Sequence, residues 1–377
     1  MSRPLRIAQV SPYGLTRFGG VRSHIQGLGE ALVARGHTVT VLAPGADGAL
    51  GTLPVVGCGA VRPVHFSGTR FDVAWAPWAR CRAVLAPGFD VLHLHTLWNP
   101  AVPLQLAAHF RGTRVATFHD VPGLDTPRWA TMLMPPAAAL LRHLLLHATI
   151  GVSPAVSAYL GAGTHHVIPN GVGDAPVHDT QTVHGTASSV APVLYLGRLD
   201  ARKDVGTLLD AMAGVATQLG DATPPLVIAG DGPLRPTLEA HAARVGLTRV
   251  TFLGDVPDAQ KWQLLATARC VVAPSRAGES FGIVLLEAMR AGTLPLAADN
   301  PGYRHVLDGD GRALCFPAGR ADALAALVVR ALTDTAWRGA MQRWAAKRWP
   351  RFAWSQVAAE VERVYHDALH RRPPRHP

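Results

Sequence analysis

The chain has 377 residues, 48% hydrophobic and 16% charged, a balance that excludes a disordered chain and suits two globular domains. Its four cysteines show no Cys-x-x-Cys spacing, so the sequence indicates neither a disulfide framework nor a zinc knuckle. The net charge of +10 is uneven, because residues 1–150 hold 13 arginines, no lysine and 6 acids, or 13 − 6 = +7. Such a basic half could face anionic lipid, an acidic acceptor or nucleic acid, or form a solvated arginine-rich surface.

The first half of the chain alternates short apolar runs with helical sequence. Residues 7–10 predict a strand, and Ile25, Leu28 and Leu32 recur on one face of a helix that Gly36 ends. Further strands are expected at residues 38–42, 91–95, 115–119 and 166–168. This alternation favours a parallel, doubly wound sheet.

A polar, turn-rich stretch at residues 171–191 predicts a domain boundary, after which the alternation restarts. Strands are expected at residues 193–196, 226–229, 250–253 and 271–273, with a helix near residues 205–219. We therefore predict an α/β fold of two Rossmann-like domains, residues 1–175 and 190–350, which face each other across a deep ligand cleft. Residues 351–377 would add a last helix, at about 354–370, that could cross back to the first domain, and a tail.

No segment predicts a signal peptide or a membrane span. The first apolar run is short, and prolines, an arginine and histidines interrupt the longest one, residues 129–152. We expect a cytoplasmic protein. Peripheral contact with an anionic membrane is a further hypothesis, motivated by the basic first half and by Trp75 and Trp78 beside Arg80 and Arg82.

Two carboxylates flank a glycine-containing turn at residues 279–287. Glu279 precedes an apolar helix for which Ser280 is the expected N-cap, and the amides of its first turn, near Gly282, could bind phosphate. Glu287, further along the helix, could accept hydrogen bonds from ribose hydroxyls. Both acids could equally be ordinary surface residues of a helix. A sugar joined through diphosphate to ribose has the order of groups that this stretch would bind.

Positive charge for a departing diphosphate is expected from Arg198 and Lys203, after the first strand of the second domain, although both could belong to a solvated loop. The pair Gly19-Gly20, before the first helix, leaves amides open to phosphate, but its spacing is not the dinucleotide fingerprint. His119, at a strand end, could hydrogen-bond a sugar hydroxyl, though such a histidine is more often structural.

The sequence does not support a metal site. His93 and His95 share one face of a strand, but no carboxylate or cysteine pattern accompanies them. The turns at residues 229–233 and 254–261 lack an Asp-x-Asp pair for a metal-bound diphosphate. Both fit tight turns near a nucleotide. We therefore predict no metal and no other cofactor.

Together these segments resemble the retaining GT-B glycosyltransferases of the family-4 group. The resemblance rests on segments that occur in family order over nearly the whole chain: Gly19-Gly20, Thr117-Phe118-His119, VIPNGV at 167–172, Gly197-Arg198 with Arg202-Lys203, and the Glu279 and Glu287 pair. Within this group the chain resembles in particular the bacterial phosphatidylinositol mannosyltransferases, through residues 19–24, 115–119, 278–285 and 306–310.

The resemblance implies a role for each of these residues. His119, Arg198, Lys203 and Glu279 would be catalytic, with His119 and Glu279 at the transferred sugar. The nucleotide-sugar would be bound by Gly19, Gly20, Arg202, Val256, Asp258, Lys261, Ser280, Phe281, Gly282, Ile283 and Glu287. Tyr13 and Arg70 would bind the acceptor, although residues 65–70 lack the Asn-Gly-Ser element of the relatives.

We therefore predict a metal-independent retaining hexosyltransferase that moves mannose from GDP-mannose to a lipid or glycan acceptor, with a phosphatidylinositol-like lipid as one candidate. One alternative is a family-4 enzyme that uses a UDP-sugar for glycolipid or polysaccharide synthesis. Another is a nucleotide-sugar-binding protein without turnover. An NAD-dependent oxidoreductase lacks its glycine fingerprint, and a nucleic-acid partner rests on charge alone, so neither is predicted.

Overall fold

The structure is a computed structural model that describes residues 3–15, 19–66, 69–96, 101–121, 128–161, 166–173 and 191–370. The chain divides into two compact units, here called unit 1 (Met1–Gly171 with Phe352–Pro377) and unit 2 (Val172–Arg351). Residues 174–190 of the turn-rich stretch predicted at 171–191, and the tail from residue 371, lie outside the described residues.

Unit 1 contains an eight-stranded sheet in the order β10-β9-β8-β7-β1-β2-β4-β3. Its neighbouring strands pair in parallel except β3 and β4, which are antiparallel. The central strands β7 and β8 are buried at every residue, as expected where helices cover both faces of a parallel sheet. The strands are β1 (Arg6–Val10), β2 (Thr38–Ala43), β3 (Gly48–Leu50), β4 (Leu53–Gly57), β7 (Val91–His95), β8 (Thr113–Phe118), β9 (Ala148–Gly151) and β10 (His166–Val167).

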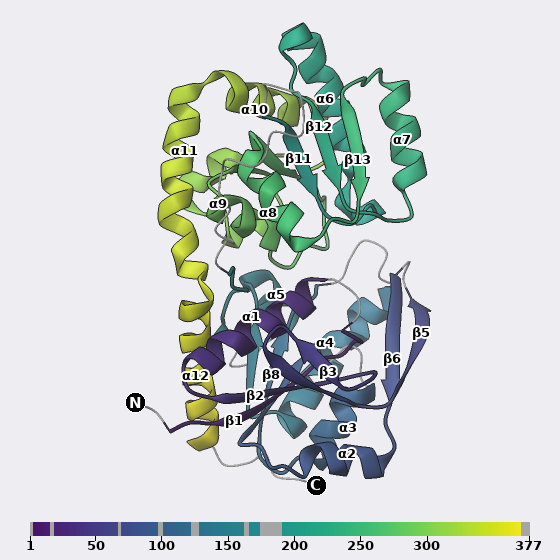
Figure 1. The fold of residues 1–377 in the computed structure, drawn as a ribbon, viewed down its shortest axis with the longest axis vertical. Helices are drawn as coiled ribbons and strands as arrows, with labels where there is room; N and C mark the ends of the chain where they lie inside the picture. Colours follow the sequence, from purple (N-terminus) through teal and green to yellow (C-terminus); the bar gives the residue numbers. More distant parts are fainter. Residues whose placement is uncertain are drawn as a thin grey trace. The chain divides into compact units, whose positions relative to one another are not determined.

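Helices α1 and α12 cover one face of this sheet, and Figure 1 shows them side by side. Their apolar residues join those of the central strands in one buried cluster, so the C-terminal helix belongs to the core of unit 1. An antiparallel hairpin, β5 (Ala60–Phe66) with β6 (Thr69–Trp75), forms a separate sheet. The helices of unit 1 are α1 (Gly20–Ala34), α2 (Trp78–Leu85), α3 (Ala101–His109), α4 (Arg128–Leu145), α5 (Pro154–Tyr159) and α12 (Trp354–His370).

Unit 2 contains a six-stranded parallel sheet in the order β13-β12-β11-β14-β15-β16. Its strands are β11 (Val193–Leu196), β12 (Leu226–Ala229), β13 (Val250–Gly254), β14 (Cys270–Ala273), β15 (Leu294–Ala298) and β16 (Cys315–Phe316). Its α-helices are α6 (Val205–Leu219), α7 (Arg235–Arg244), α8 (Asp258–Thr267), α9 (Ile283–Arg290), α10 (Ala321–Thr333) and α11 (Thr335–Arg348). Short 3-10 helices lie at η1 (Ala201–Lys203), η2 (Gly220–Ala222), η3 (Tyr303–His305), η4 (Gly309–Leu314) and η5 (Trp349–Phe352).

The predicted fold class, two parallel Rossmann-like sheets, is confirmed. In each unit, predicted site residues lie in loops that follow parallel strands, among them His119 after β8 and Glu279 after β14, as expected at the carboxyl ends of such strands. Within the part of the chain that is described, no helix is both long and apolar enough to cross a bilayer.

Candidate active site

Lys203 and Glu279 form an ion pair in unit 2. Lys203 ends η1, which follows β11, and Glu279 lies in the loop between β14 and α9. The Lys203 Nζ atom donates to Glu279 Oε1 at 2.5 Å. Their side chains are only 26% and 14% exposed. Two residues 76 positions apart, both assigned to the reacting end of a donor, are thus brought into direct contact.

Arg198 and Arg202 lie on either side of a shared carboxylate. Asp200 Oδ2 is 3.2 Å from Arg202 Nη2 and 3.7 Å from Arg198 Nε. The other Asp200 oxygen accepts from the backbone N–H of Arg202 and so caps η1. Because the side chains of Arg198 and Arg202 remain 49% and 34% exposed, their guanidinium groups keep donors available for an anion.

Two strand-end glycines hold the loops after β11 and β12 against each other. Gly197 and Gly230 have φ values of 153° and 127°, within the region that favours glycine. A Cβ atom on Gly230 would lie 2.0 Å from the Gly197 carbonyl oxygen. The Tyr195 hydroxyl donates to the Arg198 carbonyl at 2.7 Å, which fixes the start of the arginine loop.

A second lysine–glutamate pair lies at Lys261 on α8. Its Nζ atom is 2.7 Å from Glu287 Oε1 on α9 and 3.1 Å from Asp258 Oδ1. Burial opposes the charge of Lys261, but the two carboxylates outweigh it and raise its pKa. Val256 lies in the loop between β13 and α8 and is half-buried. The predicted nucleoside residues therefore lie in the loop after β13, on α8 and on α9.

The predicted start of helix α9 is wrong by two residues. Ser280 is not its N-cap, because the helix begins at Ile283 and Gly282 occupies the cap position in a left-handed conformation with φ 94°. A Cβ atom on Gly282 would lie 2.6 Å from the ring of Tyr303, which explains why glycine stands there. Phe281 is 2% exposed, so its side chain belongs to the core and only its backbone could serve a ligand.

His119 belongs to a cluster of buried histidines in unit 1. β8 ends at Phe118, so His119 follows the strand rather than ending it. Its Nε2 atom is 3.1 Å from Nδ1 of His95, whose Nε2 is 3.0 Å from the side-chain amide of Gln9. His24 packs edge-on against His119 with ring centroids 4.6 Å apart and hydrogen-bonds Asn170 at 2.7 Å.

His93 stacks on His95 with ring centroids 4.4 Å apart and completes this cluster, whose histidines are neutral. Burial lowers the pKa of His24 to about 4 and that of His93 to about 3, and it depresses the pKa of His95 and His119 well below the usual value. One ring nitrogen from each of His24, His95 and His119 lies within 4.8 Å of the others, close enough to hold a metal ion. From the sequence, only His93 and His95 were weighed as possible metal ligands. No pattern in the sequence indicated that His24 would lie beside them.

The remaining predicted residues lie in unit 1. Gly19 and Gly20 are exposed at the start of α1, where Gly19 is the N-cap without a side chain. Tyr13 is half-buried after β1, and burial, with a smaller contribution from Asp120, raises its pKa. Arg70 pairs with His65 in the register of the β5–β6 hairpin.

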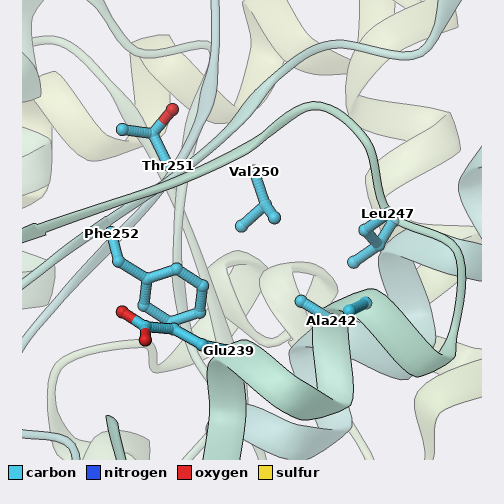
Figure 2. A pocket seen from close by; sticks show the side chains of 7 residues that line it. Glu239, Ala242, Leu247, Val250, Thr251 and Phe252 are labelled. Carbon is cyan, nitrogen blue, oxygen red and sulfur yellow. The ribbon is translucent and has the colours of Figure 1, made fainter. Parts of the chain in front are cut away.

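A surface pocket lies elsewhere in unit 2. Figure 2 shows it between α7 and the edge strand β13, lined among others by Glu239, Ala242, Val250 and Phe252. None of the residues assigned to the donor lines it. The donor assignment therefore rests on the loops at the strand ends and not on this pocket.

Comparisons with known proteins agree with this architecture. Residues 18–175 match the family "Glycosyltransferase Family 4" and residues 181–348 match "Glycosyl transferases group 1". Sucrose-phosphate synthase from Thermosynechococcus elongatus is similar in structure, with a TM-score of 0.74 and 24% identity over 97% of this chain and 99% of that one. HepE from Anabaena, solved with UDP and glucose, gives a TM-score of 0.75 at 20% identity over 96% and 100% of the two chains. The fold is that of the GT-B glycosyltransferases.

Relatives of known name extend over almost the entire chain. The phosphatidyl-myo-inositol mannosyltransferase of Mycolicibacterium smegmatis is 34% identical over 96% of this chain and 93% of its own length. That of Mycobacterium leprae is 35% identical over 96% of both chains. The chain therefore belongs to glycosyltransferase family 4, and the predicted family is confirmed.

Proposed function

We propose that the protein is a retaining hexosyltransferase that moves mannose from GDP-mannose to a phosphatidylinositol-like lipid. The observation that carries this proposal is the identity of 34% and 35% over 96% of the chain to proteins named phosphatidyl-myo-inositol mannosyltransferase. The two lysine–glutamate pairs support it, because they supply charge and hydrogen-bond acceptors for the two ends of a nucleotide-sugar.

In this proposal the side chains of unit 2 stabilise the leaving diphosphate without a metal. The acceptor oxygen bonds to the anomeric carbon on the face from which the diphosphate leaves, the carbon–oxygen bond to the diphosphate breaks, and a phosphate oxygen takes the acceptor's proton. Negative charge then grows on the diphosphate. Arg198, Arg202 and Lys203 are the cations placed to stabilise it, and stabilising charge that develops in the transition state accelerates the reaction.

Other side chains would hold the rest of the donor and the acceptor. Glu279 and His119 are assigned to sugar hydroxyls, because a carboxylate accepts and a neutral imidazole can donate or accept. Val256, Asp258, Lys261 and Glu287 are assigned to the nucleoside. On the acceptor side the assigned residues are Tyr13 and Arg70, with amides near Gly19 and Gly20 at the phosphates.

Peripheral membrane association is part of the proposal. Trp75 and Trp78 are 64% and 52% exposed, and Met132 and Leu133 on α4 are 74% and 61% exposed. Large exposed apolar side chains of this kind suit the interface of a bilayer. Arg80 is less available to bind anionic lipid than its place beside Trp78 suggested. It donates to the Gly57 carbonyl and pairs with Asp47 at 3.3 Å.

A nucleotide-sugar screen tests this proposal. Purified protein is incubated with GDP-mannose, UDP-glucose and UDP-galactose, and thermal stabilisation and sugar release are measured with vesicles of phosphatidylcholine, with or without phosphatidylinositol. We expect stabilisation by GDP-mannose and transfer only when phosphatidylinositol is present, with an α-linked product seen by NMR. If sugar is transferred from a UDP-sugar and not from GDP-mannose, the donor in this proposal is the UDP-sugar. Binding of a nucleotide-sugar without release of its sugar to any acceptor would show a non-catalytic protein.

A further inference from the structure

The buried groups around His119 form one chain across three neighbouring strands. Gln9 lies on β1, His95 ends β7, and His119 follows β8, and these strands are adjacent in the sheet. Gln9 and His95 are fully buried and His119 is 7% exposed. The chain runs from Gln9 through the two nitrogens of His95 to Nε2 of His119, with links of 3.0 and 3.1 Å.

Each neutral imidazole carries one proton, so the direction of one hydrogen bond in the chain fixes the others. Helix α1 fixes that direction at Gln9. With its NH₂ group toward His95, the Gln9 amide donates to His95 Nε2 at 3.0 Å and to the Ile25 carbonyl at 3.3 Å, while its oxygen accepts from the Gly29 N–H at 3.1 Å. The reverse orientation would set its oxygen against the Ile25 oxygen and its NH₂ against the Gly29 N–H.

The remaining protons follow in order. His95 Nε2 accepts from Gln9, so the proton of His95 lies on Nδ1 and is donated to His119 Nε2. His119 must then carry its own proton on Nδ1. Within the described residues, Nδ1 of His119 makes no hydrogen bond, so this N–H is available to a ligand.

We infer that Gln9 and His95 are positioning residues that hold His119 in the tautomer with its proton on Nδ1, so that His119 presents a hydrogen-bond donor to the transferred sugar. The part that concerns the sugar rests on the proposed function. The ligand atom at His119 is accordingly an acceptor, such as a hydroxyl or ring oxygen of the sugar. An unprotonated Nδ1 on His119 would instead favour a ligand group that donates a hydrogen bond.

The same arrangement disfavours a metal ion in the cluster. A cation held by His24, His95 and His119 would need a free lone pair on one ring nitrogen of each histidine. With Gln9 in this orientation neither nitrogen of His95 is free, because Nε2 accepts from Gln9 and Nδ1 carries the proton donated to His119. His24 Nε2, which is buried without a partner, is the one nitrogen left for a cation, and one nitrogen is too few.

The test reads the tautomer directly. The full-length protein is labelled with ¹⁵N-histidine, and long-range ¹H–¹⁵N spectra are assigned to His119 through a His119→Asn variant. We expect a protonated Nδ1 and an unprotonated Nε2 in the wild type. Gln9→Glu can only accept from His95, so it should reverse the chain and move the proton of His119 to Nε2. Gln9→Met removes the directing group and should give a mixture of the two tautomers.

Tyr365→Phe is the matched control. The Tyr365 hydroxyl on α12 is also buried and hydrogen-bonds His93 at 2.6 Å. His93 lies on β7, as His95 does, but this hydrogen bond is not part of the chain to His119. We expect it to lower the melting temperature without changing the tautomer of His119. A proton on Nε2 of His119 in the wild type, an unchanged tautomer in both Gln9 variants, or a stoichiometric divalent metal in the purified protein would overturn the inference.

Turnover separates this inference from the proposed function. In Gln9→Glu, we expect kcat for sugar transfer to fall about tenfold, the value of one hydrogen bond, with a smaller change in the KM for the donor. Reversal of the tautomer with no reduction in kcat would overturn the assigned use of His119. The assigned tautomer in a protein that transfers no sugar would leave the positioning intact and contradict the proposed function alone.

Discussion

Two of the three lysines in the chain form ion pairs with the two glutamates that the sequence singled out. A lysine side chain is expensive to bury, and each of these is held about a quarter exposed by a carboxylate within 2.7 Å. The third, Lys347, lies exposed on α11. Because partly exposed ion pairs contribute little to stability, we infer that these pairs are kept for a ligand.

The two pairs should affect different kinetic constants. Lys203→Met and Glu279→Gln remove groups assigned to the departing diphosphate and the reacting sugar, so we expect kcat to fall roughly 100-fold. Lys261→Met and Glu287→Gln remove groups assigned to the nucleoside, which binds equally in ground and transition states, so the donor KM should rise about tenfold with little change in kcat. Steady-state kinetics with the donor found in the screen measure both.

Lys347→Met is the matched control for these variants, because it removes an exposed lysine on α11 to which no role is assigned. It should leave both constants unchanged. Near wild-type turnover in both Lys203→Met and Glu279→Gln would remove this site assignment. A kcat effect of equal size in all four variants would contradict the division between the two pairs.

At the scale of elements, close approach between helices explains glycines that local propensity does not favour. Gly27 lies within α1, where glycine costs about 1 kcal/mol relative to alanine. A Cβ atom there would lie 2.2 Å from the ring of Trp354 on α12, and a Cβ atom on Gly171 would lie 2.3 Å from the same ring. The indole of Trp354 therefore occupies space that two glycines leave open.

Gly27→Ala should destabilise the protein although it improves the helix propensity of α1. The added methyl group overpacks the contact with Trp354, and we expect the free energy of unfolding to fall by about 1–3 kcal/mol. The double variant Gly27→Ala with Trp354→Leu should recover part of this loss. Unfolding in urea, followed by circular dichroism, measures the change.

Gly214→Ala, in the interior of α6, is the matched control. A Cβ atom there would meet the Cβ of Ala325 at 3.4 Å, an ordinary contact. The same substitution should therefore be neutral or stabilise by up to about 1 kcal/mol. Equal effects of the two substitutions would show that helix propensity, and not the approach of α12, decides the cost at Gly27.

Elements with a strong local pattern could be predicted from the sequence, and elements made by distant pairing could not. The bounds of α12 and of β7, β11 and β12 were predicted to the residue, because amphipathic and apolar periodicity is local. β4 and β5 were missed, since Pro54 and Pro63 interrupt their apolar runs and usually argue against a strand. The start of α9 was misplaced because its glycine cap depends on Tyr303, which is distant in sequence.

The same limit applies to the candidate site. Lys203, Glu279 and His119 were identifiable as side chains at strand ends, where ligands of parallel sheets bind. Gln9 was not identified, because a single amide within an apolar strand has no local pattern. His24 was included only within the segment 19–24 and received no role, because its partner Asn170 lies 146 residues away. Partners that meet only through the sheet order could not be predicted from one sequence.

At the scale of the whole molecule, the two units differ in how they respond to acid. Unit 1 contains the four buried histidines at positions 24, 93, 95 and 119, and burial lowers the pKa of each. It also contains His37, whose pKa is lowered by burial. In the described part of unit 2, burial lowers the pKa of one histidine, His305. Protons therefore bind to unit 1 mainly after it unfolds.

Unit 1 should lose stability before unit 2 as the pH falls below about 6.5, the unfolded pKa of histidine. Above that pH neither state of a buried histidine is protonated, so the full stability is present. Below it the unfolded state binds a proton that the folded state excludes, down to a pH of about 4 for His24 and about 3 for His93. Each such histidine costs about 1.4 kcal/mol per pH unit over that range.

Scanning calorimetry between pH 7.5 and 5.0 measures this difference, because the unit with more buried histidines should show the larger decrease in melting temperature. His93→Gln is the informative variant, since it removes one proton-binding group while an amide can still hydrogen-bond Thr117 or Tyr365, the two partners of His93. It should lower the melting temperature at pH 7.5 and reduce the pH dependence of the unit 1 transition by about one proton. Equal shifts of both transitions would show that the buried histidines do not set the acid response of unit 1. A His93→Gln variant with an unchanged pH dependence would show that His93 binds no additional proton on unfolding.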